Sequence, residues 1–208
     1  MCGLAGIISY RKPIDASHIN YMTDSIYYRG PDDEGALSLD LECNAVNTFR
    51  RASELNGSSR GNRVLFGHRR LSILDLTQDG HQPMSYMNKQ LWIVYNGEIY
   101  NYIELREELK KIGYKFKSQT DTEVILAAYD HWGEDCLNHF NGMWSFVILD
   151  LRNHKIWGST DRYGIKPMYI YDDGNFVLFA SEVKQFLTLD YLNINLDIGS
   201  IFDFLVIG

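Results

Sequence analysis

The chain has 208 residues, 45% of them hydrophobic and 13% aromatic, which is enough apolar material for one large or two small packed domains. Its 27 acidic and 20 basic residues give a formal charge of −7, and the basic residues form no long run, which argues against nucleic acid as a partner. No apolar stretch reaches the roughly 18–20 residues that span a bilayer, and no signal-peptide pattern opens the chain, so we expect no membrane partner and a cytoplasmic protein.

The first third of the chain is predicted to consist mostly of strands. A buried strand at residues 4–10 follows Cys2 directly and would anchor the N-terminus. Apolar residues at helical spacing predict a helix over 15–28, which residues 29–33 end. Further strands are predicted at 35–41, 43–49 and 63–73. The polar, Gly/Ser-rich segment 50–62 is predicted to be a surface loop, with a lid as one role it could have.

The middle of the chain is predicted to contain two helices. A strand at 90–95 leads through a turn at 96–101 into a helix that runs to about residue 112, where Asn101 and Glu104 have the spacing of a capping box. A second helix is predicted to begin near Thr120, because Thr120 and Glu123 have the same spacing.

The last third is predicted to form antiparallel strands at 142–151, 155–160, 168–171 and 176–180, with a hairpin turn at 172–175. Helices are predicted near 181–187 and 198–205. Strands early, helices in the middle and strands late indicate an α+β fold with two packed sheets flanked by helices, since the alternation of a parallel βαβ fold is absent.

Cys2 would become the N-terminal residue if Met1 were removed. A terminal cysteine carries a thiol nucleophile together with a base, because the free α-amine has a reference pKa of about 7.7–8.0. Taken alone, a cysteine at position 2 is more typical of a chance residue or a small buried apolar side chain. Cys2, Cys43 and Cys136 cannot all pair and have no C-x-x-C spacing, so reduced thiols are expected.

Six motifs, in their order and approximate spacing, resemble the N-terminal glutaminase domain of glutamine-dependent asparagine synthetases, which are class II glutamine amidotransferases. They are residues 1–7 (MCGLAGI), 29–32 (RGPD), 68–73 (HRRLSI), 80–84 (GHQPM), 96–101 (NGEIYN) and 120–123 (TDTE), and 161–167 (DRYGIKP) and 180–184 (ASEVK) extend the match. The resemblance implies the N-terminal-nucleophile (Ntn) hydrolase fold, a four-layer αββα sandwich of two mainly antiparallel sheets. It also implies a glutaminase domain over 1–196, with 197–208 starting the connection to a C-terminal ATP-dependent synthetase domain that this sequence lacks.

The chemistry implied by the resemblance is hydrolysis of the glutamine side-chain amide. Cys2 would attack the amide carbon to give a glutamyl thioester, releasing ammonia and then glutamate. The Asn96 side-chain amide and the Gly97 backbone N–H would stabilise the oxyanion, and only glycine lets the backbone approach so closely. An isolated Asn-Gly pair more often marks a hairpin turn, but the motif around it argues against that alternative.

The implied substrate contacts match the two charged ends of glutamine. Arg70 would bind the α-carboxylate, assisted by backbone groups of Leu71 and Ile73, and Asp121 would receive the α-ammonium. Glu98 would be a further polar contact. Without the motif context, a solvent-exposed arginine at a strand edge and an aspartate that complements a helix dipole would be the better interpretations.

Other conspicuous residues are assigned structural roles. The spacing of His131, Cys136 and His139 is not a usual zinc pattern, so packing is predicted and no metal site is expected. His68 and His81 are predicted to be structural hydrogen-bonding groups. Within the family motif, Arg29 and Asp32 would shape the pocket wall and Tyr28 replaces a frequent histidine, whereas Thr120 can cap its helix as serine does.

The synthetase domain implied by the resemblance would bind ATP and magnesium and use the ammonia to amidate aspartate, while the glutaminase domain itself would need no cofactor. The same glutaminase chemistry could serve another acceptor, and glucosamine-6-phosphate synthase and phosphoribosylpyrophosphate amidotransferase share the nucleophile. A non-catalytic binding module on the Ntn fold is the alternative from a different class. Protein that retains Met1 is expected to be inactive. The sequence leaves the oligomeric state open, a homodimer included.

Overall fold

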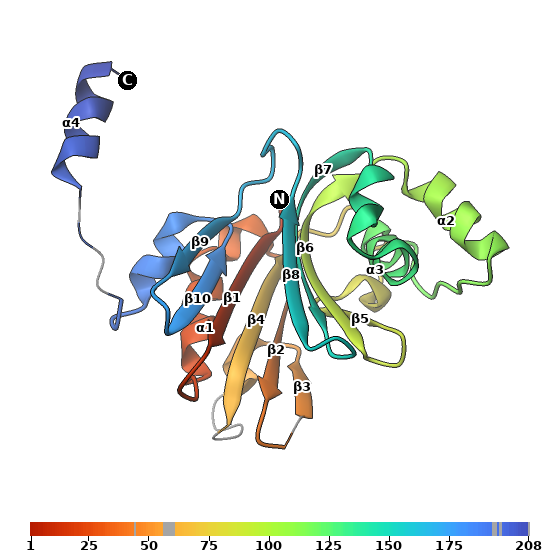
Figure 1. Cartoon of the computed structure of the whole chain (residues 1–208), viewed down its shortest axis with the longest axis horizontal. Coiled ribbons are helices and arrows are strands. Elements are labelled where there is room, and N and C mark those ends of the chain that lie inside the picture. Colours follow the sequence, from red (N-terminus) through yellow and green to blue (C-terminus); the bar gives the residue numbers. More distant parts are fainter. Residues whose placement is uncertain (44, 56–60, 193–194, 196, 208) are drawn as a thin grey trace.

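The computed structural model describes residues 1–43, 45–55, 61–192, 195 and 197–207, and its strands form two antiparallel sheets (Figure 1). The larger sheet has six strands, in the order β3 (Ala45–Phe49), β2 (Asp33–Asp40), β4 (Asn62–Arg70), β1 (Gly3–Ser9), β10 (Phe176–Ala180) and β9 (Tyr169–Asp172). The smaller sheet has four, in the order β5 (Met84–Tyr86), β6 (Leu91–Ile99), β7 (Gly142–Asp150) and β8 (Lys155–Thr160). β1 therefore lies inside the larger sheet, which ties down the N-terminus as predicted.

Helices cover the outer face of each sheet (Figure 1). α1 (Ser17–Asp24) and the 3-10 helix η5 (Val183–Thr188) pack on the six-stranded sheet, and α3 (Asp121–Trp132), with α2 (Tyr102–Lys111) beside it, packs on the four-stranded sheet. The two sheets pack face to face around a third apolar cluster that includes Leu4, Phe66, Trp92, Val94 and Phe179. The predicted α+β four-layer αββα sandwich is confirmed.

The alternation of side chains along β6 connects the layers. Trp92 and Val94 face the other sheet, whereas Ile93, Tyr95 and Ile99 belong to the cluster under the helices. Because successive side chains of a strand point to opposite faces, Asn96 is directed to the inter-sheet side and Tyr95 to the helix side. β6 thus presents the Asn96 amide on one of its faces and the Tyr95 hydroxyl on the other, at the same end of the sandwich.

The end of β6 differs from the prediction. Pairing with β7 continues from Leu91 to Ile99, so Asn96 and Gly97 lie within a strand opposite Ser145 and Trp144, and the predicted turn at 96–101 is wrong at its start. The reason is tertiary, because the ladder of β7 supplies hydrogen bonds that local turn propensity does not anticipate. The Asn101 capping box is also wrong, since the Asn101 side chain bonds His139 O and Asn141 N instead of its helix. Thr120 caps α3 as predicted, accepting from Glu123 N.

Several other boundaries are corrected. The predicted helix over 15–28 is α1 followed by the 3-10 helix η1 (Tyr27–Arg29), the strand over 63–73 ends at Arg70, and η5 is a 3-10 helix. β5 and the 3-10 helices η3 (Gln78–Gly80) and η4 (Gly133–Asn138) were not predicted. The predicted loop 50–62 contains the 3-10 helix η2 (Ala52–Leu55) with Ala52 buried, and residues 56–60 lie outside the described residues, so its lid role stays a prediction.

The C-terminal strands form two hairpins in different sheets, because β8 pairs with β7 while β9 pairs with β10. The turn at 172–175 is confirmed, and Gly174 has a φ of +79° there, a conformation that glycine adopts freely. α4 (Ile198–Ile207) stands apart from the sandwich with every described side chain exposed (Figure 1). The domain boundary at 196 stays a prediction. Across the described ranges, no helix is long and apolar enough to cross a membrane.

Candidate active site

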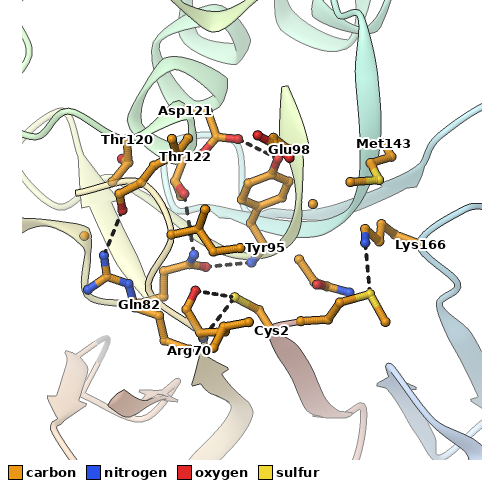
Figure 2. Close-up of a pocket in the computed structure, with 17 residues that line it drawn as sticks. Cys2, Arg70, Gln82, Tyr95, Glu98, Thr120, Asp121, Thr122, Met143 and Lys166 are labelled. Atoms are coloured by element: carbon orange, nitrogen blue, oxygen red, sulfur yellow. Dashed lines mark hydrogen bonds between the residues drawn. The ribbon is translucent and has the colours of Figure 1, made fainter. Parts of the chain in front are cut away.

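A pocket opens where the N-terminal end of β1 meets the ends of β4 and β6 and the start of α3 (Figure 2). All the residues that the sequence predicted for the site line it, namely Cys2, Arg70, Leu71, Ile73, Asn96, Gly97, Glu98 and Asp121. Met1 also lines the pocket, and its Sδ lies 3.0 Å from the Nζ of Lys166. The fold therefore brings together groups that are up to 165 positions apart in the chain.

The thiol of Cys2 is partly buried and contacts one residue closely. Leu71 N donates to Cys2 Sγ at 3.4 Å, and Sγ lies 3.6 Å from Leu71 O. Burial raises the pKa of the Cys2 thiol above its ordinary value, with the Leu71 N–H opposing that shift. The thiol is thus protonated near neutral pH and needs a base before it can act as a nucleophile.

The two nearby histidines are occupied elsewhere, which confirms their predicted structural roles. The Nε2 of His68 lies 2.9 Å from Tyr95 O, and the Nδ1 of His81 lies 2.8 Å from Asp33 Oδ2. Complete burial lowers the pKa of His68 to about 4, so its ring is neutral at physiological pH. Among the described residues, no histidine is hydrogen-bonded to Cys2 Sγ.

The backbone of Cys2 is held by Arg29, which does more than shape a wall. Arg29 Nε donates to Cys2 O at 3.0 Å, and its Nη1 pairs with Glu182 Oε1 at 2.8 Å. Tyr28, which stands where histidine is frequent, donates its hydroxyl to the same Glu182 carboxylate at 2.6 Å. Asp32 accepts from Ser72 N at 2.7 Å and so anchors the segment that carries Leu71 and Ile73.

Asn96 presents an unused donor. Its side chain is 2% exposed, and its Nδ2 atom is buried with no hydrogen-bond partner among the described residues. A buried amide without a partner costs free energy, and such orphaned groups tend to mark places where a ligand completes the bonding. The side-chain amide that the motif predicted as an oxyanion donor is therefore available in the pocket.

The Gly97 N–H lies in a row of β6 amides that point away from β7. Tyr95 N donates to Gln82 Oε1 at 2.7 Å and Ile99 N donates to Asp121 Oδ2 at 2.9 Å, and the amide of Gly97 lies between them. Trp144, opposite Gly97, directs its own O and N to Asp161 on the other side. The amide of Gly97 therefore faces the pocket.

Gly97 has to be glycine for a reason that the sequence did not indicate. A Cβ there would collide with Met143 O and would lie 2.7 Å from both Trp144 Cα and Tyr95 Cε2. The described residues therefore require glycine here through the close approach of the neighbouring strand and the Tyr95 ring, and the predicted approach to the oxyanion stays a prediction.

Arg70 is buried, 5% exposed, so the solvent-exposed alternative is wrong. Its Nη1 donates to Thr77 O at 3.0 Å, and its Nη2 donates to Leu74 O at 3.4 Å and to Asp75 O. Arginine has five N–H donors, so these three bonds leave the Nε hydrogen and one Nη1 hydrogen. Arg70 holds the segment 74–77 against the pocket and has two N–H groups without an acceptor among the described residues.

Asp121 is the first residue of α3 and is 5% exposed. Its Oδ2 accepts from the Tyr95 hydroxyl at 2.8 Å and from Ile99 N at 2.9 Å. Burial raises the pKa of the Asp121 carboxyl, and the hydrogen bonds to the anion oppose that shift. These contacts across to β6 go beyond an interaction with the helix dipole.

The remaining predicted residues differ in exposure. Leu71 contacts the thiol, Glu98 is half-buried opposite Met143, and the side chain of Ile73 is 68% exposed at the rim. The sequence missed Tyr95, Gln82 and Lys166 as pocket residues. Gln82 and Lys166 lie in motifs that were recognised, whereas Tyr95 had no signal besides a strand pattern.

His131, Cys136 and His139 have the packing roles that were predicted. The ring of His139 stacks on Trp132 with centroids 3.9 Å apart, His131 contacts Tyr114 and Trp132 edge-on, and Cys136 is buried in the core under the helices.

Comparisons with known proteins agree with the pocket. A family model described as a glutamine amidotransferase domain matches residues 46–208. A Methanocaldococcus jannaschii protein provisionally named glutamine-hydrolysing asparagine synthetase 2 is 41% identical over 207 residues, covering 93% of this chain and 36% of the relative. Glutamine-hydrolysing asparagine synthetase 1 of Bacillus subtilis is 38% identical over 191 residues, covering 90% of this chain and 27% of the relative. The chain thus spans about a third of the length of these relatives.

Among solved structures, the chain is similar in fold to glutamine phosphoribosylpyrophosphate amidotransferase from B. subtilis, determined in complex with ADP and GMP. The TM-score is 0.74 at 21% identity, and the match covers 90% of this chain and 43% of that chain. At this identity the likeness concerns the fold.

Proposed function

The chain belongs to the glutamine amidotransferase family, and from that premise we propose that it is the glutaminase domain of an asparagine synthetase. In this proposal it hydrolyses the side-chain amide of glutamine to glutamate and ammonia, with Cys2 as the nucleophile.

The observation that carries the proposal is the convergence of three groups on one pocket: the Cys2 thiol, the unpartnered Asn96 Nδ2 and the Gly97 N–H. After removal of Met1, the α-amine of Cys2 accepts the thiol proton and the thiolate attacks the amide carbon. Asn96 and Gly97 donate to the resulting oxyanion, and the ammonium form of the amine protonates the amide nitrogen, so that the C–N bond breaks and ammonia leaves. Water then cleaves the glutamyl thioester and the thiol is regenerated.

The charged ends of the pocket support glutamine as the substrate. Arg70 keeps two N–H donors for the α-carboxylate, with backbone groups of Leu71 and Ile73 nearby. Asp121 offers a buried carboxylate to the α-ammonium, and Glu98 adds a further polar contact. An ion pair at each end would orient the amide toward Cys2.

The names and lengths of the relatives support a larger assembly. We propose that the ammonia passes to a C-terminal synthetase domain of the same polypeptide, which binds ATP and magnesium and amidates aspartate, with residues 197–208 starting the connection. No cofactor is assigned to the glutaminase domain itself. The proposal includes a cytoplasmic location and no nucleic-acid or membrane partner. It leaves the oligomeric state open, with a homodimer as one possibility. Another ammonia acceptor is the alternative.

The experiment that tests the catalytic assignment couples N-terminal mass analysis to a glutaminase assay. Protein with a free Cys2 should release ammonia from glutamine and should be labelled by a glutamine-directed electrophile. Protein that retains Met1 should do neither, because its amine is in a peptide bond and Met1 lines the pocket. A free Cys2 without ammonia release or labelling would refute the proposal and support a non-catalytic binding module.

A further inference from the structure

Tyr95 connects β6 to the proposed binding site for the substrate amine. Its side chain is 3% exposed and lines the pocket, and its hydroxyl donates to Asp121 Oδ2 at 2.8 Å. Figure 2 shows the ring of Tyr95 reaching from β6 to the Asp121 carboxylate beside Glu98.

The backbone of Tyr95 is fixed by two side chains from outside its strand. Its N–H donates to Gln82 Oε1 at 2.7 Å, and its carbonyl oxygen lies 2.9 Å from His68 Nε2. β5 pairs with β6 only between Leu91 and Ile93, so the outward-facing backbone groups of Tyr95 have no strand partner. Gln82 and His68 take that place. Because buried backbone groups must be hydrogen-bonded, these two bonds fix the position of the Tyr95 backbone and hence of the Cα from which the ring extends.

The ring itself is also confined. A Cβ at Gly97 would lie 2.7 Å from Tyr95 Cε2, so the ring packs over the glycine whose amide faces the pocket. Tyr95 belongs to the buried cluster under α3, together with Ile93 and Ile99. A hydroxyl held by a fixed backbone and a packed ring has little freedom, so it orients the group that it bonds.

The Asp121 carboxylate needs such a partner. Burial disfavours its charged form and raises its pKa, and hydrogen bonds to the anion, those from Ile99 N and the Tyr95 hydroxyl first among them, oppose that effect. Burial and the neighbouring Asp121 raise the pKa of Tyr95 well above its ordinary value, so its hydroxyl remains a donor. Tyr95 and Ile99 N hold the same oxygen, Oδ2, from two directions.

We propose that Tyr95 is a positioning residue that holds Asp121 in the orientation required by the α-ammonium of the substrate, and so determines preference for amides that carry an α-amino group. This inference rests on the proposed glutaminase function. It predicts that removal of one hydroxyl weakens discrimination between glutamine and glutaramate, the same amide without its amino group.

The test compares Tyr95→Phe with the unchanged protein, both with a proven free Cys2. The variant keeps the packed ring and removes the bond to Asp121. A hydrogen bond to a charged group contributes enough to predict that KM for glutamine rises about 10–100-fold while kcat changes little. The kcat/KM for glutaramate should stay the same, so the ratio of the two kcat/KM values falls by the same factor. Unchanged glutaramate turnover also shows that the variant is folded.

The matched control is Tyr86→Phe, which removes a hydroxyl bond to Lys115 O at 2.9 Å on β5, outside the pocket. It should change neither substrate's kinetics. A second readout is protection of Cys2 from alkylation, which should weaken in Tyr95→Phe for glutamate and not for glutarate.

An active parent protein with an unchanged glutamine-to-glutaramate ratio in Tyr95→Phe, or an equal loss for both substrates, would overturn this inference alone. A parent protein that releases no ammonia from glutamine would refute the proposed function and the inference with it.

Discussion

Arg29 donates a hydrogen bond from Nε to the carbonyl oxygen of Cys2 across 3.0 Å, and its guanidinium is in turn held by Glu182. The proposed nucleophile therefore has its backbone tied to a segment 27 positions away. Since an N-terminal residue has no preceding strand to restrain it, this bond supplies orientation that β1 alone does not.

Arg29→Ala is expected to lower kcat for glutamine about 10–100-fold, because a small displacement of a nucleophile costs rate steeply. Steady-state ammonia release measures this. Arg63→Ala is the control, since Arg63 Nε makes the same kind of bond, at 3.0 Å, to Ser9 O at the far end of β1. Equal losses in both variants would indicate general loosening of the strand and would contradict a specific effect on Cys2.

Asn96→Ala should reduce kcat about 100–1,000-fold with little change in KM, because it removes one oxyanion donor. Asn96→Ala removes no hydrogen bond of Nδ2, which has no partner among the described residues, so the free energy of unfolding should not decrease for that reason. Asn101→Ala should do the opposite: its side chain bonds both His139 O and Asn141 N outside the pocket, so stability falls and activity persists. Kinetics and urea unfolding on both variants separate the two effects.

Arg70→Ala should raise KM for glutamine far more than it slows alkylation of Cys2 by a neutral reagent, because the guanidinium is proposed to bind the α-carboxylate whereas Cys2 Sγ is hydrogen-bonded to Leu71. Loss of its bonds to Leu74, Asp75 and Thr77 should also make the 74–77 segment more susceptible to proteolysis. Arg69→Ala is the neighbouring control, because Arg69 pairs with Asp24 and Glu34 outside the pocket. If substrate binding and thiol reactivity fell equally, Arg70 would have a structural role only.

Gly97→Ala should destabilise the protein by about 1–3 kcal/mol as an overpacked site, because the added methyl group would collide with Met143 O. Denaturant unfolding measures the change. In Gly199→Ala, on the exposed helix α4, Asp197 Oδ1 at 3.3 Å is the only atom of the described residues that an added Cβ would meet, so this variant should be neutral or slightly stabilising. Similar stability of both variants would mean that β7 can move away from β6.

The free energy of unfolding should fall as pH drops from 6.5 toward 4, because His68 has a native pKa of about 4 and an unfolded reference near 6.5. In that window the unfolded chain binds more protons than the folded one, so stability is present above pH 6.5 and decreases by about 3 kcal/mol by pH 4. His68→Gln should flatten this part of the pH profile, measured by urea unfolding, whereas the exposed His154→Asn should leave it unchanged. A steep profile that persists in His68→Gln would assign the dependence to other groups.

The fold was largely predictable because strand and helix periods are local. The β9–β10 hairpin, β7 and β8 lie within about one residue of their predicted positions, and α3 begins after its predicted cap. β5 is not predicted because a strand of three residues is too short to show an alternating pattern of apolar and polar residues. The predicted end of β6 is too early because Asn-Gly is typical of a turn, and only the pairing with β7 shows that the strand continues.

The sequence by itself determined which residues are assigned to the proposed chemistry, because the motifs and their order can be recognised without a structure. All eight predicted site residues line one pocket. Only the tertiary structure decided how their hydrogen bonds are distributed. Arg70 donates three hydrogen bonds to carbonyl oxygens of residues 74–77, Arg29 donates one to the backbone of Cys2, and the Tyr95 hydroxyl donates one to the Asp121 carboxylate. The Tyr95 bond joins a sheet to a helix of another layer, the Arg29 bond joins η1 to the residue before β1, and the Arg70 bonds hold the loop after β4. No local period of the sequence encodes which of these side chains and backbone groups meet.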